Sequence, residues 1–362
     1  MMALRTAIVG CGAVAQRLYR KPLQQLERRG LLRVVALIDP VPEHAQAMAA
    51  FFPKAKIASD LDEALVSSTA ELTLVLSPAH LHCAHTVAAL RHGSHVLCEK
   101  PMALRADECA RMENAAAERR RILAVGMIRR FFPAYSKLRA MIRDGELGRL
   151  RSFEYREGHR FEWDVTTPAA FKPRSQGGTG VLFDIGPHAI DHLAWTFGDL
   201  DVLSYADDAL AGVESNVTMD VAAPECRGEV HLSWNQPQAN ELRVTGTKAE
   251  AVLRIGYFDQ LAIKRAGRFE PVAIDASFPV DGESPGRKLL SPRSYPDAVA
   301  CQIVQVVRAI TLGERPAADG GAGRACVSLL ESALVLARPI DTPWLDLHQR
   351  EAFQRLHWRR SA

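Results

Sequence analysis

The chain has 362 residues, and its 45 Lys and Arg against 42 Asp and Glu give a formal net charge of +3 at pH 7. This charge is too small to predict a nucleic-acid partner or an anionic membrane surface, and no apolar run approaches the ~20 residues that span a bilayer. Seven cysteines without C-x-x-C or Cys/His metal spacing predict reduced thiols, a cytoplasmic protein and no bound metal. Because a strand begins within a few residues of the N-terminus, no signal peptide is expected.

The first predicted element is a buried strand at 7–9, followed by a glycine-rich turn and a helix from about residue 14 to 26. The turn reads G-x-G-x-x-A, in which the first glycine permits a tight turn and the second lets a pyrophosphate approach the backbone. The helix start offers unpaired N–H groups and its positive dipole end to phosphates. The motif predicts a dinucleotide site, the alternative being a glycine turn without a nucleotide. The expected contacts come from Gly10, Cys11, Gly12, Ala13, Val14 and Ala15.

A second strand, predicted over 32–38, ends at Asp39, which lies 24 residues after Ala15. A carboxylate at about this offset hydrogen-bonds to the ribose 2′-OH and repels a 2′-phosphate. Residues 40–43 contain no Arg or Lys that would bind such a phosphate. The sequence therefore predicts NAD in preference to NADP, and the alternative is an acid that merely ends a strand.

Strands and helices alternate through about residue 126, which predicts a doubly wound parallel sheet, a Rossmann domain over residues 1–126. The further strands are expected at 72–76, 95–98 and 122–126, and the helices at 43–52, 60–65, 82–92 and 105–121.

The hydrophobic pattern changes after residue 133, where a helix is expected over 134–144. From residue 150 onward, apolar and polar residues alternate along the strands, as in a sheet with one wet and one dry face. We expect an α/β domain over 127–338 with a large, mostly antiparallel open sheet and two late helices, near 296–312 and 322–337. Residues 275–294 are expected to form a loop, and residues 339–362 a C-terminal extension to which no role is assigned.

Three further motifs carry a family resemblance: Ser-Pro-Ala-His-Leu-His at 77–82, Gly-Ser-His-Val-Leu-Cys-Glu-Lys-Pro at 93–101, and the Asp-x-Gly-x-His run within 177–191. With the glycine-rich turn, they make the chain resemble the Gfo/Idh/MocA oxidoreductases, which include glucose-fructose oxidoreductase and inositol dehydrogenase. The resemblance covers roughly residues 3–337. It implies NAD(P)-dependent oxidation or reduction of a sugar, cyclitol or related polyol, and a C-terminal sheet that often packs against another subunit.

The resemblance also assigns residues to roles. Lys100 matches the active-site lysine of the family, and Asp184 and His188 match its Asp-x-x-x-His pair, so these three are the expected catalytic residues. Further cofactor contacts are expected from Ser77, Pro78, His82, Glu99 and Lys100. The chain departs from the family at 77–79, which commonly reads Thr-Pro-Asn, so the asparagine contact near the cofactor is lost.

The chemistry of hydride transfer suits these side chains, because an alcohol needs a base for its proton and a group that stabilises charge on its oxygen. His188 is the expected base, Lys100 the expected donor to the substrate oxygen, and Asp184 the group that orients the lysine or the sugar hydroxyls. The three are also expected to bind substrate. The alternatives are that Lys100 is a solvated loop lysine, that Asp184 caps a helix and that His188 is a core histidine. We expect the role of a core histidine for His192.

Substrate contacts are also expected in the segment 157–164, where His159, Arg160 and Trp163 suit polyol recognition by hydrogen bonds and ring stacking. An exposed loop is the alternative. We also expect a homodimer or homotetramer formed through the C-terminal sheet, because Met219 and Trp234 place large apolar groups on one sheet face.

Three functions are compatible with these features. The leading one is an NAD-dependent sugar or cyclitol dehydrogenase. A second is a redox-neutral glycosidase of the same family that uses NAD transiently, and a third is a protein that senses a dinucleotide without turnover.

Overall fold

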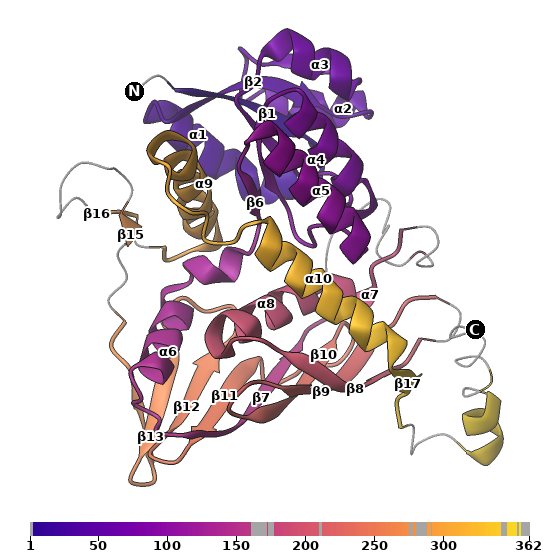
Figure 1. Cartoon of the computed structure of the whole chain (residues 1–362), viewed down its shortest axis with the longest axis vertical. Coiled ribbons are helices and arrows are strands. Elements are labelled where there is room, and N and C mark those ends of the chain that lie inside the picture. The colour runs from indigo at the N-terminus through magenta and orange to yellow at the C-terminus, as the bar shows by residue number, and fades with distance from the viewer. Residues whose placement is uncertain are drawn as a thin grey trace. The chain divides into compact units, whose positions relative to one another are not determined.

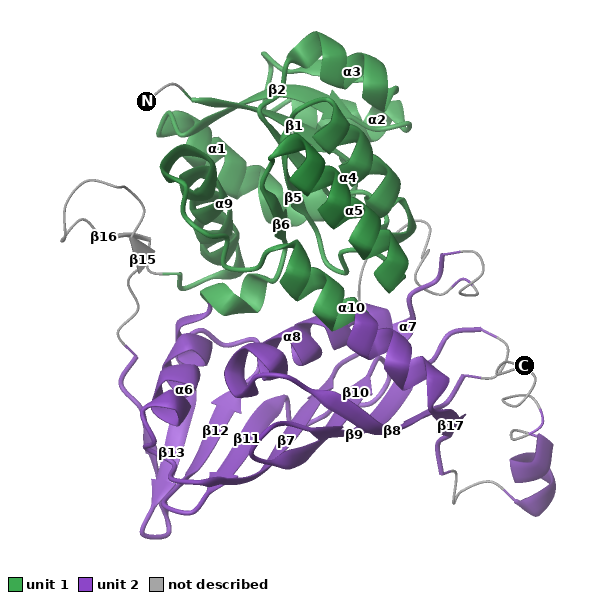
Figure 2. Ribbon diagram, in the orientation of Figure 1, with its two compact units in different colours: residues 1–131, 275–327 green, residues 132–274, 328–362 purple. Residues whose placement is uncertain are grey.

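The computed structural model describes residues 3–160, 172, 177–209, 212–274, 278–279, 288–290, 292–341, 346–352 and 355. The chain folds into two compact units, one of residues 1–131 and 275–327 and one of residues 132–274 and 328–362, coloured green and purple in Figure 2. The boundaries expected from the sequence, 1–126 and 127–338, are contiguous, whereas here the chain returns to its first unit. The reason is helix α9 (Tyr295–Leu312), whose apolar side packs against helix α1 (Arg20–Arg28).

The first unit contains a six-stranded, all-parallel sheet in the order β3-β2-β1-β4-β5-β6, which confirms the doubly wound Rossmann prediction. Strand β3 was not predicted from the sequence because this short edge strand has no buried residue to mark it. The strands are β1 (Leu4–Val9), β2 (Leu32–Ile38), β3 (Lys56–Ala58), β4 (Leu72–Val75), β5 (His95–Cys98) and β6 (Leu123–Val125). The other helices are α2 (Pro42–Ala49), α3 (Leu61–Ser68), α4 (His82–Arg91), α5 (Ala106–Arg119) and the 3₁₀ turns η2 (Ala79–Leu81) and η3 (Ile128–Phe131).

The helix expected from residue 14 to 26 is two pieces, a π-helical turn η1 (Ala15–Tyr19) followed by α1. Pro22 explains the change, because its ring has no N–H and would clash with the carbonyl of Leu18 in a continuous α-helix. A π turn places one extra residue in the helix and relieves such a clash.

The second unit contains a nine-stranded sheet in the order β14-β13-β12-β11-β7-β10-β9-β8-β17. Only the β7–β10 and β8–β17 pairs are parallel, so the expected large, mostly antiparallel sheet is confirmed. The strands are β7 (Leu150–Gly158), β8 (Asp201–Asp207), β9 (Asn216–Ala222), β10 (Arg227–Ser233), β11 (Glu241–Gly246), β12 (Glu250–Arg254), β13 (Leu261–Arg265), β14 (Arg268–Pro271) and β17 (Ala337–Pro339).

Three helices cover one face of this sheet, α6 (Pro133–Arg143), α7 (Gly180–Asp184) and α8 (Gly186–Phe197) (Figure 1). The residues under them are apolar, and Met219 and Trp234 are only 2% and 3% exposed. The last helix, α10 (Gly320–Val335), belongs partly to each unit. Two short strands, β15 (Phe278–Pro279) and β16 (Lys288–Leu290), pair within the segment expected to be a loop.

All seven cysteines are buried free thiols. Among the described residues, no helix combines the length and the apolar composition needed to cross a membrane.

Candidate active site

The carboxyl ends of the parallel strands gather most of the predicted cofactor residues at one edge of the first sheet. Val9 of β1 pairs with Val75 of β4, and Val75 pairs with Cys98 of β5, so these strands end level with one another. Ligands of open α/β sheets bind at this edge, at the point where the strand order reverses, which here lies between β1 and β4. The residues that follow these strand ends are Gly10 to Ala15 after β1, Asp39 after β2, Ser77 and Pro78 after β4, and Glu99 and Lys100 after β5.

The two glycines of the turn are needed for different physical reasons. Gly10 has a φ of +88°, and a Cβ atom there would lie 2.6 Å from the backbone nitrogen of Ser77. Gly10 is therefore required for the fold itself, since both the dihedral and the close approach exclude a side chain. A Cβ atom at Gly12, in contrast, would meet no atom within 4 Å. The open space beside Gly12 fits the approach of a pyrophosphate to the backbone.

Asp39 accepts hydrogen bonds at both of its carboxylate oxygens, and one of them comes from the glycine-rich turn. Oδ2 accepts a hydrogen bond from the backbone N–H of Cys11 at 2.7 Å, and Oδ1 accepts one from Val41 at 2.9 Å. Burial, and then the charge of Asp39, raise the pKa of the Cys11 thiol to about 12, so the thiol stays protonated. Each carboxylate oxygen has a second lone pair, so Asp39 can hold the turn and still accept hydrogen bonds from a ribose.

The imidazole of His44 lies next to this carboxylate, with Nδ1 3.4 Å from Oδ1 of Asp39. The sequence pattern pointed to residues 40–43 as the neighbours of a 2′-phosphate. His44 lies one position beyond them, on helix α2, and its spacing of five residues from Asp39 gave no signal of its own.

Lys100 follows β5, and its backbone N–H donates to Oε2 of Glu99 at 2.9 Å. The other oxygen of that carboxylate accepts a 2.5 Å hydrogen bond from the hydroxyl of Tyr19, which in turn accepts one from Gln302 at 3.2 Å. Burial raises the pKa of Glu99, while Tyr19 and Lys100 act in the opposite direction. These bonds brace the backbone of Lys100. Tyr19 and Gln302 were not identified from the sequence, where they look like ordinary helix residues.

His82 connects the segments that follow β4 and β5. Its ring is 1% exposed, with Nδ1 2.7 Å from the carbonyl oxygen of Pro101 and Nε2 2.7 Å from that of Ser77. Burial lowers the pKa of His82 to about 4, although both carbonyl contacts act to raise it. Because both ring nitrogens face backbone carbonyls, His82 positions the Ser77 and Lys100-Pro101 segments relative to each other. The peptide bond between Lys100 and Pro101 is cis.

Asp184 and His188 lie in the second unit, on two successive helices rather than one. Asp184 is the last residue of α7 and His188 the third of α8, and Ile185 joins them with dihedrals near the helical range, φ −86° and ψ −36°. Asp184 therefore ends a helix and does not cap an N-terminus. The indole Nε1–H of Trp234 donates to Oδ2 of Asp184 at 3.1 Å, which orients this carboxylate.

Glu214 is a fully buried carboxylate at the start of α7 that was not identified from the sequence. Its Oε1 accepts a hydrogen bond from the backbone N–H of Leu182 at 3.0 Å. A Cβ atom at Gly180, which has a φ of +61°, would overlap this carboxylate. The sequence signal for Glu214 is Gly180, because the missing side chain there makes room for the carboxylate that holds the helix ending at Asp184.

The remaining predicted residues follow strand β7. His159 and Arg160 are exposed, and the backbone N–H of His159 donates to the carbonyl of Ser233 at 3.2 Å. Trp163 lies outside the described residues. His192 is 1% exposed, and its ring centroid lies 4.4 Å from that of Tyr135, as expected for a core histidine.

The first unit thus has the strand order, glycine turn and acid of the Rossmann dinucleotide-binding class, and the second has a mixed sheet with three helices on one face. A family model described as "Oxidoreductase family, NAD-binding Rossmann fold" matches residues 4–127, and one described as "GFO/IDH/MocA C-terminal domain" matches residues 135–252. The chain belongs to the Gfo/Idh/MocA family, which confirms the resemblance seen in its sequence.

Two curated relatives illustrate the range of the family. The chain is 32% identical over 198 residues to D-glucoside 3-dehydrogenase of Escherichia coli (strain K12), covering 54% of each chain. It is 31% identical over 147 residues to scyllo-inositol 2-dehydrogenase (NADP(+)) IolW of Bacillus subtilis (strain 168), covering 41% of this chain and 40% of the relative. The alignments thus span about half or less of the length of these relatives.

Solved structures share the fold over most of the chain. A levoglucosan dehydrogenase in complex with NADH and levoglucosan superposes with a TM-score of 0.78 at 19% identity, covering 92% of this chain and 97% of the other. An aldose-aldose oxidoreductase from Caulobacter crescentus, complexed with glycerol, gives a TM-score of 0.77 at 21% identity, with coverage of 92% and 97%.

Proposed function

We propose that the chain is an oxidoreductase that acts on CH–OH groups, transferring a hydride between NAD and a secondary alcohol or ketone of a sugar, cyclitol or sugar derivative. The observation that carries the proposal is the carboxyl edge of the first sheet. There the ends of three neighbouring strands lead to Gly10, Asp39 and Ser77, and the next strand leads to Lys100. This edge supplies both a dinucleotide site and a cation suited to bind the substrate oxygen.

The proposed cofactor contacts are most of those expected from the sequence, from the turn at 10–15, Asp39, Ser77, Pro78, Glu99 and Lys100. His82 was also expected to contact the cofactor, but it is buried with both ring nitrogens next to backbone carbonyls, so it is proposed to position Ser77 and Lys100 instead. Bound NAD supplies the hydride acceptor of the reaction. The open space beside Gly12 supports its binding, and the buried charge of Asp39 supports NAD over NADP. One relative is named for NADP, so this preference needs a direct measurement.

Three side chains are proposed to act on the substrate. The ammonium of Lys100 binds the reacting oxygen and stabilises the charge that develops on it. The imidazole of His188 takes the hydroxyl proton and returns it in the reverse direction. Asp184, held by Trp234, orients the sugar hydroxyls. His159, Arg160 and Trp163 are proposed as further substrate contacts.

The names of the relatives support a sugar or cyclitol as substrate, because they include a glucoside dehydrogenase and inositol dehydrogenases. The decisive experiment is a screen of sugars, inositols and nucleotide sugars with the purified chain, in which NADH formation is followed by absorbance with NAD and, separately, with NADP. Net reduction of NAD by at least one free polyol is the expected result.

Two outcomes would favour the other functions. Release of an aglycone from a glycoside without net NADH would identify the redox-neutral glycosidase. Tight NAD binding without turnover of any substrate in the screen would identify a dinucleotide sensor.

A further inference from the structure

Three carboxylates form a row across adjacent strands of the nine-stranded sheet, on the face opposite the buried apolar residues. Glu229 of β10 is the register partner of Glu154 on β7 and, on its other side, of Asp220 on β9. The neighbours of Glu229 along the strand alternate with it, and Val230 points to the buried side. Like charges directly opposite each other in a sheet are destabilising. This row therefore needs positive charge.

The described cations meet this need only in part. Arg156 donates two hydrogen bonds to Glu154, at 2.8 and 2.6 Å, but both go to the same oxygen, Oε1. Arg243 is the register partner of Glu154 on β11, yet its hydrogen bonds go to Glu241 and Glu250. Among the described residues, the row of three carboxylates is thus in direct contact with one guanidinium, which leaves about two negative charges to be balanced over a distance.

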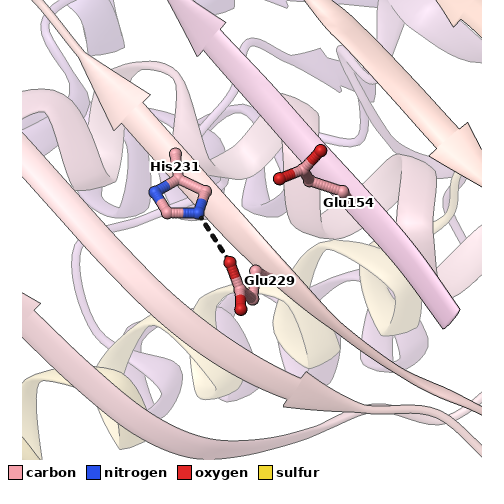
Figure 3. Close-up of side chains that lie close together, drawn as sticks. All are labelled: Glu154, Glu229 and His231. Carbon is pink, nitrogen blue, oxygen red and sulfur yellow. Dashed lines mark hydrogen bonds and ion pairs between the residues drawn. The ribbon is translucent and has the colours of Figure 1, made fainter.

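A histidine completes the group. His231 follows Glu229 by two residues and so faces the same side of β10, with Nε2 3.1 Å from Oε2 of Glu229. Figure 3 shows the imidazole and the two carboxylates of Glu154 and Glu229 approaching one another from β7 and β10. One ligand atom from each of the three residues lies within 4.8 Å of the others. In the single chain the side chains are 36%, 60% and 23% exposed for Glu154, Glu229 and His231, so an ion can reach them before the expected association through this face.

We propose that Glu154, Glu229 and His231 form a binding site for a divalent transition-metal ion of the zinc type. One imidazole nitrogen with two carboxylate oxygens is a donor set that suits Zn²⁺, whereas Mg²⁺ and Ca²⁺ prefer oxygen alone. Three protein ligands leave a tetrahedral ion one position for water. The double positive charge of the ion also matches the charge that the row lacks, so binding relieves the repulsion between Glu154, Glu229 and Asp220.

In the single chain the surroundings of the site allow access from solvent. A surface hollow of about 590 Å³ is lined by Glu154, Asp220 and Glu229, together with Arg227 and Arg243. The ligands come from strands 75 residues apart in the sequence, which is why the spacing of histidines and cysteines predicted no metal. The site is independent of the proposed reaction, since Asp184 bonds to Trp234 on the other, buried side of the sheet.

The test is calorimetric titration and thermal unfolding of the full chain with Zn²⁺, and with Mg²⁺ for comparison. We expect one Zn²⁺ per chain, a rise in melting temperature with zinc concentration and no rise with Mg²⁺, because an ion that binds only the folded state stabilises it. His231→Gln and Glu229→Gln should each weaken Zn²⁺ binding by at least about tenfold, since even a group that only supports a ligand costs that much.

Two comparisons make the result specific. His92 is a matched control, because its Nε2 lies 2.8 Å from an exposed carboxylate of Asp62, but among the described residues no third ligand lies near this pair. His92→Gln should therefore bind Zn²⁺ as the wild type does. In metal-free buffer Glu229→Gln should melt at the same temperature as the wild type or higher, because the substitution removes the middle charge of the row.

Equal Zn²⁺ affinity in wild type and His231→Gln would show that the ion binds elsewhere and would overturn the proposal. So would the absence of any binding to the wild type. Neither measurement uses enzymatic turnover, so a failure of this site is distinguishable from a failure of the proposed function.

Discussion

The Oδ2 atom of Asp39 accepts a hydrogen bond from the backbone N–H of Cys11, 28 residues earlier in the chain, at 2.7 Å. The bond connects the acid at the end of β2 to the glycine-rich turn at the end of β1. The residue expected to select the cofactor therefore also holds the turn that is expected to bind the pyrophosphate. Substitutions of Asp39 affect both roles, so the choice of replacement matters.

Asp39→Asn is the informative change for cofactor preference. The amide keeps one oxygen that can accept an N–H from the turn, but it removes the charge that repels a 2′-phosphate. We expect wild type to bind NAD more tightly than NADP, and the variant to narrow this preference by about tenfold, or about 1.4 kcal/mol. Fluorescence titration with both cofactors measures it.

The control for this change is Asp208→Asn. Asp208 is another acid that accepts backbone N–H groups, from Ser215 and Asn216 at 2.8 Å each, but it belongs to the second unit. It should alter neither affinity. Tighter binding of NADP than NAD by the wild type would contradict the assigned role of Asp39.

The two glycines of the turn should respond differently to alanine. Gly12→Ala meets no neighbouring atom, so the chain should fold with a nearly unchanged melting temperature. Its methyl group occupies the approach of the pyrophosphate, and we expect NAD affinity to fall by about tenfold or more. Gly10→Ala should instead reduce the yield of folded protein, because its Cβ would overlap the backbone at Ser77. Normal NAD binding by Gly12→Ala would remove the turn from the proposed site.

Lys100→Met and His188→Ala test the proposed chemistry. General acid–base catalysis contributes about 10²- to 10⁴-fold, so we expect each variant to lose kcat by roughly that factor while the Kd for NAD stays near the wild-type value. The control is Lys137→Met, which should keep wild-type turnover. It removes a lysine on α6 whose Nζ lies 3.7 Å from Oε1 of Glu146. Near-normal turnover of Lys100→Met would show that this lysine is structural.

His82 predicts a pH dependence of stability. Its pKa is about 4 in the folded chain against 6.5 ordinarily, so between these values the unfolded chain binds more protons. The free energy of unfolding should therefore fall as the pH decreases from 6.5 toward 4, by on the order of 3 kcal/mol from this residue.

Chemical denaturation at several pH values, with wild type and His82→Gln, measures the effect. The variant should show a shallower decrease, although not a flat curve, because burial also lowers the pKa of His95 to about 4. Identical slopes in the two proteins would mean that His82 is protonated in the folded state, with both ring nitrogens donating to the carbonyls of Ser77 and Pro101.

The expected oligomer would form through the outer face of the nine-stranded sheet. Met219 and Trp234, whose size suggested association, are buried, whereas the outer face has cross-strand ion pairs such as Arg254 of β12 with Glu241 of β11. We therefore expect a dimer or tetramer whose association weakens at high ionic strength. Light scattering at micromolar concentration and varied salt measures it, and a mass of 39.8 kDa at all salt concentrations would contradict the prediction.

The sequence by itself predicted most of the elements of the first unit and the chemistry proposed for it. Short apolar runs that end in Gly10, Asp39 and Lys100 specify parallel strands, and the carboxyl ends of such strands meet at one edge. The alternation of apolar and polar residues likewise predicted the open second sheet. Hydrophobic periodicity and the residues that form turns are local properties, so a single sequence reveals them.

Only the tertiary structure decided which polar groups meet. Tyr19 and Gln302 reach Glu99 from helices that are distant in sequence, and Glu154 faces Glu229 because β7 and β10 pair in one particular register. Hydrophobic periodicity fixes which face of a strand is buried, but a shift of two residues along the strand keeps the same face inward. The partner of each polar side chain therefore depends on packing between distant segments, and no local pattern contains that information.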